Sequence, residues 1–146
     1  MSSFGKDVRI GGPNGELSDE TATLIYVVDD DPSVRKSLKM LFRSADMEVK
    51  TFKAAEDLLK CQLREQNTCL ISDIKLKGLS GIELQQQLAE RGIKIPVIFL
   101  TAFDSNEIRQ QAKQGGAAGY FRKPMVDQAL LDTIHWAISS YLSSKE

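Results

Sequence analysis

The stretch Cys69-Leu70-Ile71-Ser72-Asp73 decides the fold of this chain. It is a short, largely apolar run that ends on one carboxylate and leads into the polar, glycine-containing turn Ile74-Lys75-Leu76-Lys77-Gly78. A continuous apolar run of this length is typical of a strand buried on both faces, as in a parallel sheet. Because the strand ends on an acid, the sequence predicts a site at Asp73.

The pattern of a strand followed by a helix recurs along the chain. Strand-like segments lie at residues 24–28, 48–52, 69–73, 95–100 and 120–122, and the second alternates like a half-exposed edge strand. Stretches with apolar residues at helical spacing follow them, at residues 32–42, 55–63, 81–92, 107–112 and 130–141. Three of these helices have capping signals, which are Asp31 before Pro32, Ser80 with Glu83, and Asp104 with Glu107.

Five strands that alternate with five helices predict an α/β fold, with a five-stranded parallel sheet covered by helices on both faces. In such sheets, ligands bind at the carboxyl ends of the strands, beside the point where the strand order reverses. The polar residues of this chain follow that rule. Asp29 and Asp30 follow the first strand, Asp73 ends the third, Thr101 follows the fourth and Lys123 follows the fifth.

Length and composition exclude several classes of protein. A chain of 146 residues suits one domain, and its 42% hydrophobic and 27% charged residues are typical of globular proteins. No apolar run approaches the roughly 20 residues of a membrane helix. The 19 basic and 20 acidic residues are scattered and give a net charge of -1, so neither a nucleic acid nor a membrane is an expected partner.

The N-terminal segment and the two cysteines indicate where the domain begins and in which compartment it lies. Residues 1–22 are rich in glycine and polar residues and show no apolar periodicity, so we expect a flexible N-terminal tail before a domain at residues 23–146. Cys61 and Cys69 form neither a disulfide framework nor a zinc-binding spacing, and the N-terminus lacks a signal-peptide core. These features favour a cytoplasmic location.

The polar residues at the predicted sheet edge suit phosphoryl chemistry. Three carboxylates gathered there repel one another, so the site requires protons or a cation, and Mg²⁺ prefers such oxygen ligands and commonly accompanies phosphoryl groups. Lys123 adds a positive charge and Thr101 a hydroxyl donor. Together they would stabilise a transferring phosphoryl group, while Asp73 is placed to act as the nucleophile.

These motifs resemble those of a CheY-like response-regulator receiver domain. The similarity rests on Val27-Val28-Asp29-Asp30-Asp31-Pro32, Asp73, Leu100-Thr101-Ala102 and Lys123-Pro124, and it covers residues 23 to about 142. Arg35-Lys36-Ser37-Leu38 and Ala55-Glu56-Asp57-Leu58-Leu59 are most similar to the receiver half of FixJ-type regulators. The resemblance implies the flavodoxin-like (βα)5 fold, with strand order 2-1-3-4-5.

The resemblance also implies a role for each site residue. Asp73 would accept a phosphoryl group from a sensor histidine kinase or a phosphotransfer protein. Asp30, Asp73 and the backbone carbonyl of Lys75 would bind Mg²⁺ directly, with Asp29 acting through water. Thr101 and Lys123 would contact the phosphoryl group, and the small Ala102 would lie where that group enters. Tyr120 would turn inward, and the Lys123-Pro124 bond would be cis.

This phosphorylation would act as a switch on the protein itself. It would change the face formed by the fourth helix, the fifth strand and the fifth helix and so control an output partner. The only catalysis expected is Mg²⁺-dependent self-phosphorylation and self-dephosphorylation, so the protein is not expected to be an enzyme in the usual sense. The sequence leaves open the downstream effector, a phosphorylation-dependent homodimer, and whether the chain is a stand-alone regulator or part of a longer one.

The chain departs from the common receiver pattern at several positions. Lys77 stands where relatives commonly carry proline, which predicts a less rigid loop after Asp73. Ala54 replaces a common serine cap before the second helix, at a cost of about 1 kcal/mol. Lys75 and Phe103 occupy positions that tune the lifetime of the phosphoryl group in this family, and we expect the bulky Phe103 to slow its hydrolysis.

Two other functions compete with the phospho-switch. Asp29-x-Asp31 resembles the nucleophile and acid of haloacid-dehalogenase-like phosphatases, although the chain is short for a cap domain, lacks a later acidic pair and would leave Asp73 without a role. A receiver-like module that docks without being phosphorylated is the second alternative. The presence of all five chemical positions argues against it.

Overall fold

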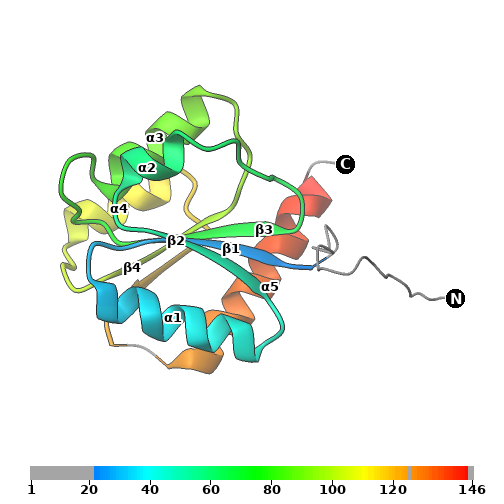
Figure 1. The fold of residues 1–146 in the computed structure, drawn as a ribbon. Helices are drawn as coiled ribbons and strands as arrows, with labels where there is room; N and C mark the ends of the chain where they lie inside the picture. Colours follow the sequence, from blue (N-terminus) through cyan, green and yellow to red (C-terminus); the bar gives the residue numbers. More distant parts are fainter. Residues whose placement is uncertain (1–21, 125, 145–146) are drawn as a thin grey trace, which may run out of the picture.

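The computed structural model of the protein describes residues 22–124 and 126–144, so the tail predicted for residues 1–22 lies almost entirely outside the described residues. Five strands alternate with five helices along the chain (Figure 1). In order, they are β1 Leu24–Val28, α1 Pro32–Ser44, β2 Glu48–Phe52, α2 Ala55–Leu59, β3 Thr68–Ser72, α3 Gly81–Glu90, β4 Val97–Thr101, α4 Asn106–Gln114, β5 Gly119–Arg122 and α5 Asp127–Ser144. This alternation confirms the predicted fold class.

The five strands form one parallel sheet in the order β2-β1-β3-β4-β5, as the resemblance implied. The register aligns the carboxyl ends of neighbouring strands. Val28 pairs with both Phe52 and Ser72, and Thr101 pairs with Arg122. The residues that follow the strands therefore meet along one edge of the sheet. Because β1 and β3 are neighbours and the chain order reverses at this point, the loops after them diverge and leave room for a ligand.

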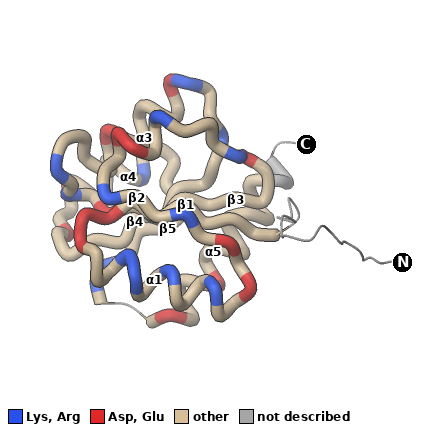
Figure 2. Tube along the Cα trace, in the orientation of Figure 1, with Lys and Arg blue, Asp and Glu red and all other residues tan. Residues whose placement is uncertain are grey.

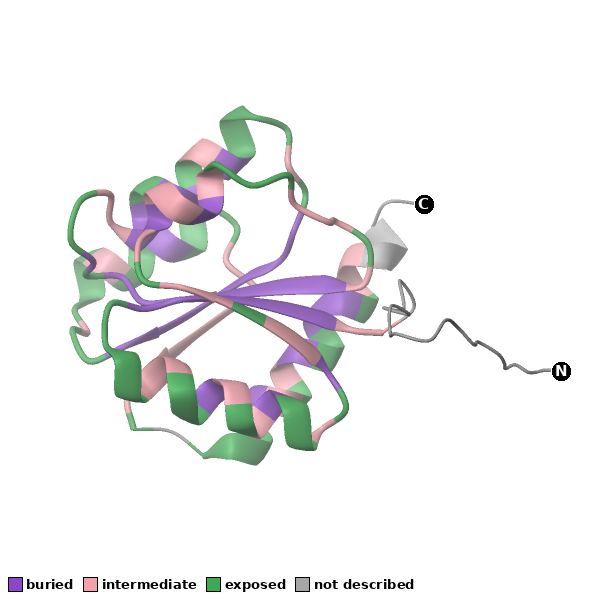
Figure 3. Cartoon of the chain, in the orientation of Figure 1, coloured by how far each residue is buried: buried purple, intermediate pink, exposed green. Residues whose placement is uncertain are grey.

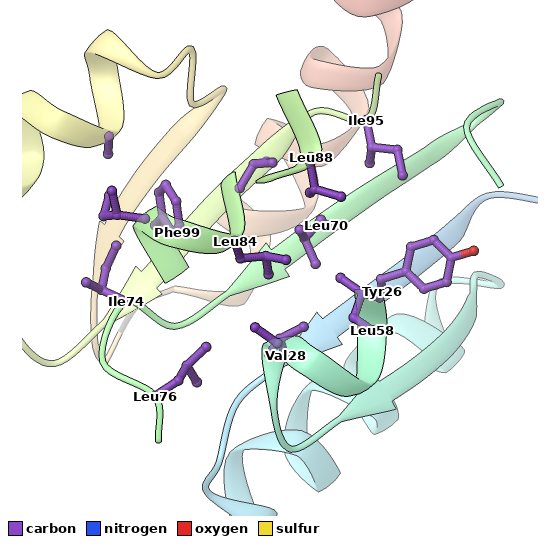
Figure 4. Packing of buried hydrophobic residues seen from close by; sticks show 14 of the residues in the cluster. Tyr26, Val28, Leu58, Leu70, Ile74, Leu76, Leu84, Leu88, Ile95 and Phe99 are labelled. Carbon is purple, nitrogen blue, oxygen red and sulfur yellow. The ribbon is translucent and has the colours of Figure 1, made fainter. Parts of the chain in front are cut away.

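Helices cover both faces of the sheet, and each face has its own core (Figure 1). Along β1, Tyr26 and Val28 point toward α2, α3 and α4, whereas Ile25 and Val27 point toward α1 and α5. Figure 4 shows the first of these cores, where Leu58 of α2 and Leu84 of α3 lie over β1 and β3. Burial on both faces explains why the strands read as continuous apolar runs instead of alternating ones.

The capping predictions are confirmed at two helices and wrong at a third. Asp31 caps α1 by accepting from Ser33 N at 2.9 Å, and Ser80 forms a capping box with Glu83 at the start of α3. For α4, however, the cap is Ser105, whose Oγ accepts from Ile108 N at 3.1 Å. Asp104 lies one residue too early and pairs instead with the side chain of Arg109.

Other boundaries shift by a few residues. α2 ends at Leu59 instead of continuing to Leu63, because the chain turns back to the sheet, where Arg64 N donates to the Tyr26 hydroxyl at 2.9 Å. Leu63 nevertheless packs against the core, so its apolar character reflected burial and not a helix. β3 is displaced by one residue and ends at Ser72, which leaves Asp73 just beyond the strand.

Buried residues concentrate in the central strands, and exposed residues line the outer faces of the helices (Figure 3). Basic and acidic residues are interspersed along the chain (Figure 2), in keeping with the scattered pattern of the sequence. Within the described ranges, no helix combines the length and the apolar character needed to cross a membrane.

One stability prediction follows from the start of α2. Ala54 occupies the N-cap position with an extended backbone (φ -142°, ψ 148°) but has no side-chain oxygen to accept a helix N–H. We expect Ala54→Ser to raise the free energy of unfolding by about 0.5–1 kcal/mol, because a serine at this position supplies the missing acceptor. Chemical denaturation measures the change.

The existing cap of α4 provides the matched comparison for Ala54→Ser. Ser105→Ala removes a hydroxyl that already accepts from Ile108 N, so it should destabilise the protein by about 1 kcal/mol. Equal stabilities of the wild type and Ala54→Ser would show that the α2 cap is not limiting.

Candidate functional site

The hydrogen-bond ladder of the sheet continues into the loops and fixes the backbone of the site. Asp29 N donates to Phe52 O at 3.1 Å, Asp73 N donates to Val28 O at 3.0 Å, and Lys123 N donates to Thr101 O at 2.8 Å. The residues that follow β1, β3 and β5 are thus held at the same edge. The peptide bond that joins Lys123 to Pro124 is cis, as the resemblance implied.

Three carboxylates meet at this edge. Oxygens of Asp29, Asp30 and Asp73 all lie within 4.8 Å of one another. Asp29 and Asp73 are buried, at 2% and 8% exposure, whereas Asp30 is exposed. Asp29 Oδ1 accepts from Asp31 N at 2.9 Å, and Asp73 Oδ1 accepts from Ile74 N at 2.7 Å. Each buried carboxylate therefore has one oxygen bound to the backbone and a second one directed elsewhere.

Lys123 joins the two buried carboxylates. Its Nζ lies 2.8 Å from Asp29 Oδ2 and 3.0 Å from Asp73 Oδ2. Burial raises the pKa of Asp29 above its usual value, and the hydrogen bond from Lys123 offsets only part of this effect. Burial also disfavours the charged form of Lys123, but its hydrogen bonds to Asp29 and Asp73 outweigh burial and raise its pKa. The ammonium group therefore balances the charge of two buried carboxylates.

An open pocket of about 440 Å³ lies over these residues, and it is lined by the acidic cluster, Lys75, Lys77, Ala102, Phe103 and Lys123. The Lys75 ammonium lies 4.4 Å from the centre of the Phe103 ring, and Phe103 is 52% exposed. These two side chains form one wall of the pocket entrance. Thr101 is fully buried, and its hydroxyl accepts from Phe103 N at 3.0 Å. Its hydroxyl is therefore engaged with the β4–α4 loop.

The acidic cluster has the chemistry of a site for a hard cation. Mg²⁺ binds oxygen ligands at about 2.0–2.1 Å, so oxygens on opposite sides of one ion are about 4.2 Å apart. The oxygens of the three carboxylates lie within 4.8 Å of one another, which is near enough for them to share one ion. Asp73 Oδ2 and Asp29 Oδ2 contact Lys123, so a cation bound in the cluster would compete with the ammonium group for the negative charge of these two carboxylates. The role of the Lys75 carbonyl stays a prediction.

Tyr120 lies in β5, away from the acidic cluster and against the start of α4. The guanidinium of Arg109 lies 5.2 Å from the centre of its ring, and Arg109 also pairs with Asp104 at 2.6 Å. The Tyr120 hydroxyl and Asp104 Oδ1 are buried, and they interact with each other without reaching the geometry of a full hydrogen bond. Burial, and then the charge of Asp104, raise the pKa of Tyr120. The inward turn of Tyr120 stays a prediction.

Two contacts, one to a site residue and one to the loop that follows Asp73, were not predicted from the sequence. Arg35 of α1 donates to the backbone carbonyl of Asp29 at 2.7 Å. The carboxylate of Glu56 in α2 accepts from Leu79 N at 2.9 Å, in the loop that follows Asp73. Both residues lie in the segments most similar to FixJ-type regulators, which was the only signal that marked them. A contact between residues 23 positions apart has no periodic signature in the sequence.

The chain is similar to a large group of known proteins. The family model described as "Response regulator receiver domain" matches residues 25–135. "Transcriptional regulatory protein TdiR" of Thauera aromatica is 39% identical over 118 residues, which cover 81% of this chain and 52% of the relative. "Nodulation protein W" of Bradyrhizobium diazoefficiens is 39% identical over 123 residues, which cover 84% and 54%. The chain thus spans about half the length of these relatives.

Solved structures agree with these sequence relatives. The response regulator StyR has a TM-score of 0.78 and 39% identity, and the match covers 86% of this chain and 63% of StyR. The N-terminal part of FixJ has a TM-score of 0.75 and 28% identity, with coverage of 82% and 95%. The similarity to FixJ inferred from short motifs thus extends to the whole fold.

The bridging lysine gives the first test of the site. We expect Lys123→Ala to lower the free energy of unfolding by about 2–3 kcal/mol without Mg²⁺, because two buried carboxylates would lose their common partner. The value is below that of a fully buried pair because the Lys123 side chain is 20% exposed. Added Mg²⁺ should raise the melting temperature of Lys123→Ala more than that of the wild type, since the competing ammonium is gone.

Thermal unfolding with EDTA or Mg²⁺ measures both effects of Lys123→Ala. Lys113→Ala is the matched control, because Lys113 is exposed on α4 and its loss should change stability by less than about 0.5 kcal/mol. A Lys123→Ala protein that is as stable as the wild type in EDTA would contradict the charge balance described above.

Proposed function

The chain belongs to the family of response regulator receiver domains of two-component systems, and we propose that Asp73 accepts a phosphoryl group from a phosphohistidine of a sensor histidine kinase or a phosphotransfer protein. The observation that carries this proposal is the contact of Lys123 with two buried carboxylates beneath an open pocket. A structural ion pair needs only one acid. A second carboxylate, and a third within 4.8 Å, suit a site that must bind a cation and also present a nucleophile to a phosphoryl group.

Asp73 is the carboxylate best suited to attack phosphorus. Its Oδ1 is held by Ile74 N, which fixes the orientation of the group and leaves Oδ2 as the nucleophilic atom. As Oδ2 bonds to phosphorus, the bond between phosphorus and the histidine nitrogen breaks, and the histidine leaves with its electron pair. The product is an acyl phosphate on Asp73. Lys123 then exchanges its contact with Asp73 Oδ2 for one with a phosphoryl oxygen.

Asp29, Asp30, Asp73 and the carbonyl of Lys75 would hold Mg²⁺, which supplies charge neutralisation for the phosphoryl oxygens when it is bound. Asp30 is the exposed member of the cluster and lies beside the pocket. Asp29 is tied to Lys123 and to Asp31 N, in keeping with a contact to the metal through water. The side chains thus divide the work of orienting the nucleophile, holding the metal and balancing charge.

Thr101 and Tyr120 would transmit the phosphorylated state to the surface. The Thr101 hydroxyl bonds Phe103 N in the β4–α4 loop, so a shift of Thr101 toward the phosphoryl group would release that loop. The same loop contains Asp104, which pairs with Arg109 over the Tyr120 ring. Movement of the loop would therefore change the packing around Tyr120 and the face formed by α4, β5 and α5. We propose that this face controls the output partner.

The wider role of the protein is proposed from its relatives. The catalysis is directed at the protein itself, through Mg²⁺-dependent self-phosphorylation and self-dephosphorylation. The output would pass to an effector in the cytoplasm, with homodimerisation on phosphorylation as one route. Because this chain spans about half the length of TdiR and of Nodulation protein W, the activities of those whole proteins are not carried over to it, and direct nucleic-acid binding is not proposed for its described domain.

The decisive experiment maps the phosphorylated residue. We expect incubation with acetyl phosphate and Mg²⁺ to label Asp73, and Asp73→Asn to abolish the label while the protein stays folded. Mass spectrometry of proteolytic fragments locates the modification, and circular dichroism checks the fold.

Other labelling results would select a competing function. Label on Asp29 would support the haloacid-dehalogenase-like phosphatase, in which Asp31 would act as the acid. Absence of label with both acetyl phosphate and a kinase, together with no response to beryllofluoride, would support a module that only docks. Labelled Asp73→Asn protein would show that another carboxylate is the acceptor.

The entrance of the pocket yields a prediction for the lifetime of the phosphoryl group. Phe103 and Lys75 contact each other at the entrance, and this wall would hinder a water molecule from reaching phosphorus in line with the bond to Asp73. We expect Phe103→Ala to lose the phosphoryl group about 3- to 10-fold faster, which corresponds to about 0.7–1.4 kcal/mol in activation free energy.

The rate is followed as loss of label from Asp73 after removal of the phosphodonor. Met40→Ala is the control, because Met40 is a similarly exposed apolar residue on α1 that does not line the pocket. Slower loss of label from Phe103→Ala than from the wild type would refute the shielding role.

A further inference from the structure

The loop between Asp73 and α3 is fixed at its two ends and in its middle. At the ends, Gly81 N donates to Ile74 O at 2.8 Å, and a side chain on Gly81 would collide with the carbonyl of Asp73. In the middle, Leu76 is buried at 8% exposure in the core beneath α2 and α3. Lys75 lies between these anchors and is exposed. The position of the Lys75 backbone carbonyl therefore depends on how the rest of the loop is held.

The carboxylate of Glu56 supplies an additional anchor from outside the loop. Glu56 Oε2 accepts from Leu79 N at 2.9 Å, and the same carboxylate lies against the Cα atom of Gly78. A side chain at position 78 would collide with it, and Gly78 has a φ of 80°, which other residues rarely adopt. The approach of Glu56 thus requires glycine at this position. Its hydrogen bond with Leu79 also lowers the pKa of Glu56, so the carboxylate is ionised at neutral pH.

The helix that carries Glu56 is packed against the core. The neighbouring residues Ala55 and Leu58 are fully buried in the core that also contains Leu76. Figure 4 shows Leu58 and Leu76 on the same side of the sheet, with Val28 nearby. The loop itself has Lys77 at the position where proline would restrict the backbone, so it depends more on contacts from outside.

We propose that Glu56 is a positioning residue for the metal site, and that its carboxylate, by holding Leu79 N, sets the loop so that the Lys75 carbonyl faces the acidic cluster. This inference rests on the proposed function. It adds a residue of α2 that touches neither the phosphoryl group nor the metal. Partners of this kind, which orient the direct ligands, typically change metal affinity by about 10- to 100-fold.

The test compares Mg²⁺ binding by variants of the full chain. We expect Glu56→Ala to raise the dissociation constant for Mg²⁺ by about 10-fold in isothermal titration calorimetry. Glu56→Gln should stay within about 3-fold of the wild type, since its amide oxygen can still accept from Leu79 N. Asp57→Asn is the matched control, because Asp57 is the neighbouring acid on α2 and its side chain makes no hydrogen bond to the loop within the described residues.

A second measurement separates positioning from loss of stability. At saturating Mg²⁺, phosphorylation of Glu56→Ala by acetyl phosphate should return to within about 2-fold of the wild-type rate, because excess metal compensates for a weakened site. Hydrogen exchange of the Leu79 amide in metal-free protein should be faster in Glu56→Ala and unchanged in Glu56→Gln. If Glu56→Ala does not fold, Glu56→Asp replaces it, since its carboxylate is one methylene shorter.

The outcomes distinguish this inference from the proposed function. Wild-type protein that binds Mg²⁺ and is labelled on Asp73, together with Glu56→Ala of equal Mg²⁺ affinity, would overturn the role of Glu56 alone. Glu56→Gln that is as impaired as Glu56→Ala would overturn the hydrogen-bond mechanism. Wild-type protein that neither binds Mg²⁺ nor is labelled would overturn the proposed function and, with it, the role of Glu56 toward the metal.

Discussion

The contact of one ammonium group with two buried carboxylates is the constraint on which the site depends. Lys123 lies 2.8 Å from Asp29 and 3.0 Å from Asp73, and it reaches them from the β5 edge of the sheet, although β3 and β4 lie between β5 and β1. Neither carboxylate tolerates burial without a partner. The parallel register that aligns the strand ends is therefore necessary for the charge balance, and any cation or phosphoryl group that enters must rearrange it.

The need to rearrange this charge balance when a ligand enters explains why the site lies where loops meet and not within the core. The strands fix Asp29, Asp73 and Lys123 through backbone hydrogen bonds, whereas Thr101 and Phe103 join the site to a loop that ends at α4. A rigid edge with one adjustable loop suits a switch, because a change of charge at Asp73 alters the contacts of the loop more easily than those of the sheet. Tyr120 lies where that loop meets β5, beside Arg109.

Much of this arrangement could be predicted from the sequence. Continuous apolar runs reveal strands buried on both faces, and the polar residues after them, Asp29, Asp73 and Lys123, mark the edge where they converge. The errors came from local competition. Asp104 and Ser105 can both cap a helix, and only the side-chain partners in space, Arg109 and Ile108, decide between them. The contact of Glu56 with Leu79 was not predictable, since it joins two elements whose distance in the sequence carries no periodic signal.

The unpredicted contact also bears on how the loop after Asp73 keeps its shape. A proline would restrict the backbone at one residue of the loop, whereas Lys77 leaves that residue its full range of conformations. Glu56 restrains the loop from a neighbouring helix, and Gly78 allows the carboxylate to come close enough. A restraint of this kind belongs to the folded state alone, so it depends on how well α2 is packed. The burial of Ala55 and Leu58 thus links the stability of α2 to the geometry of the proposed metal site.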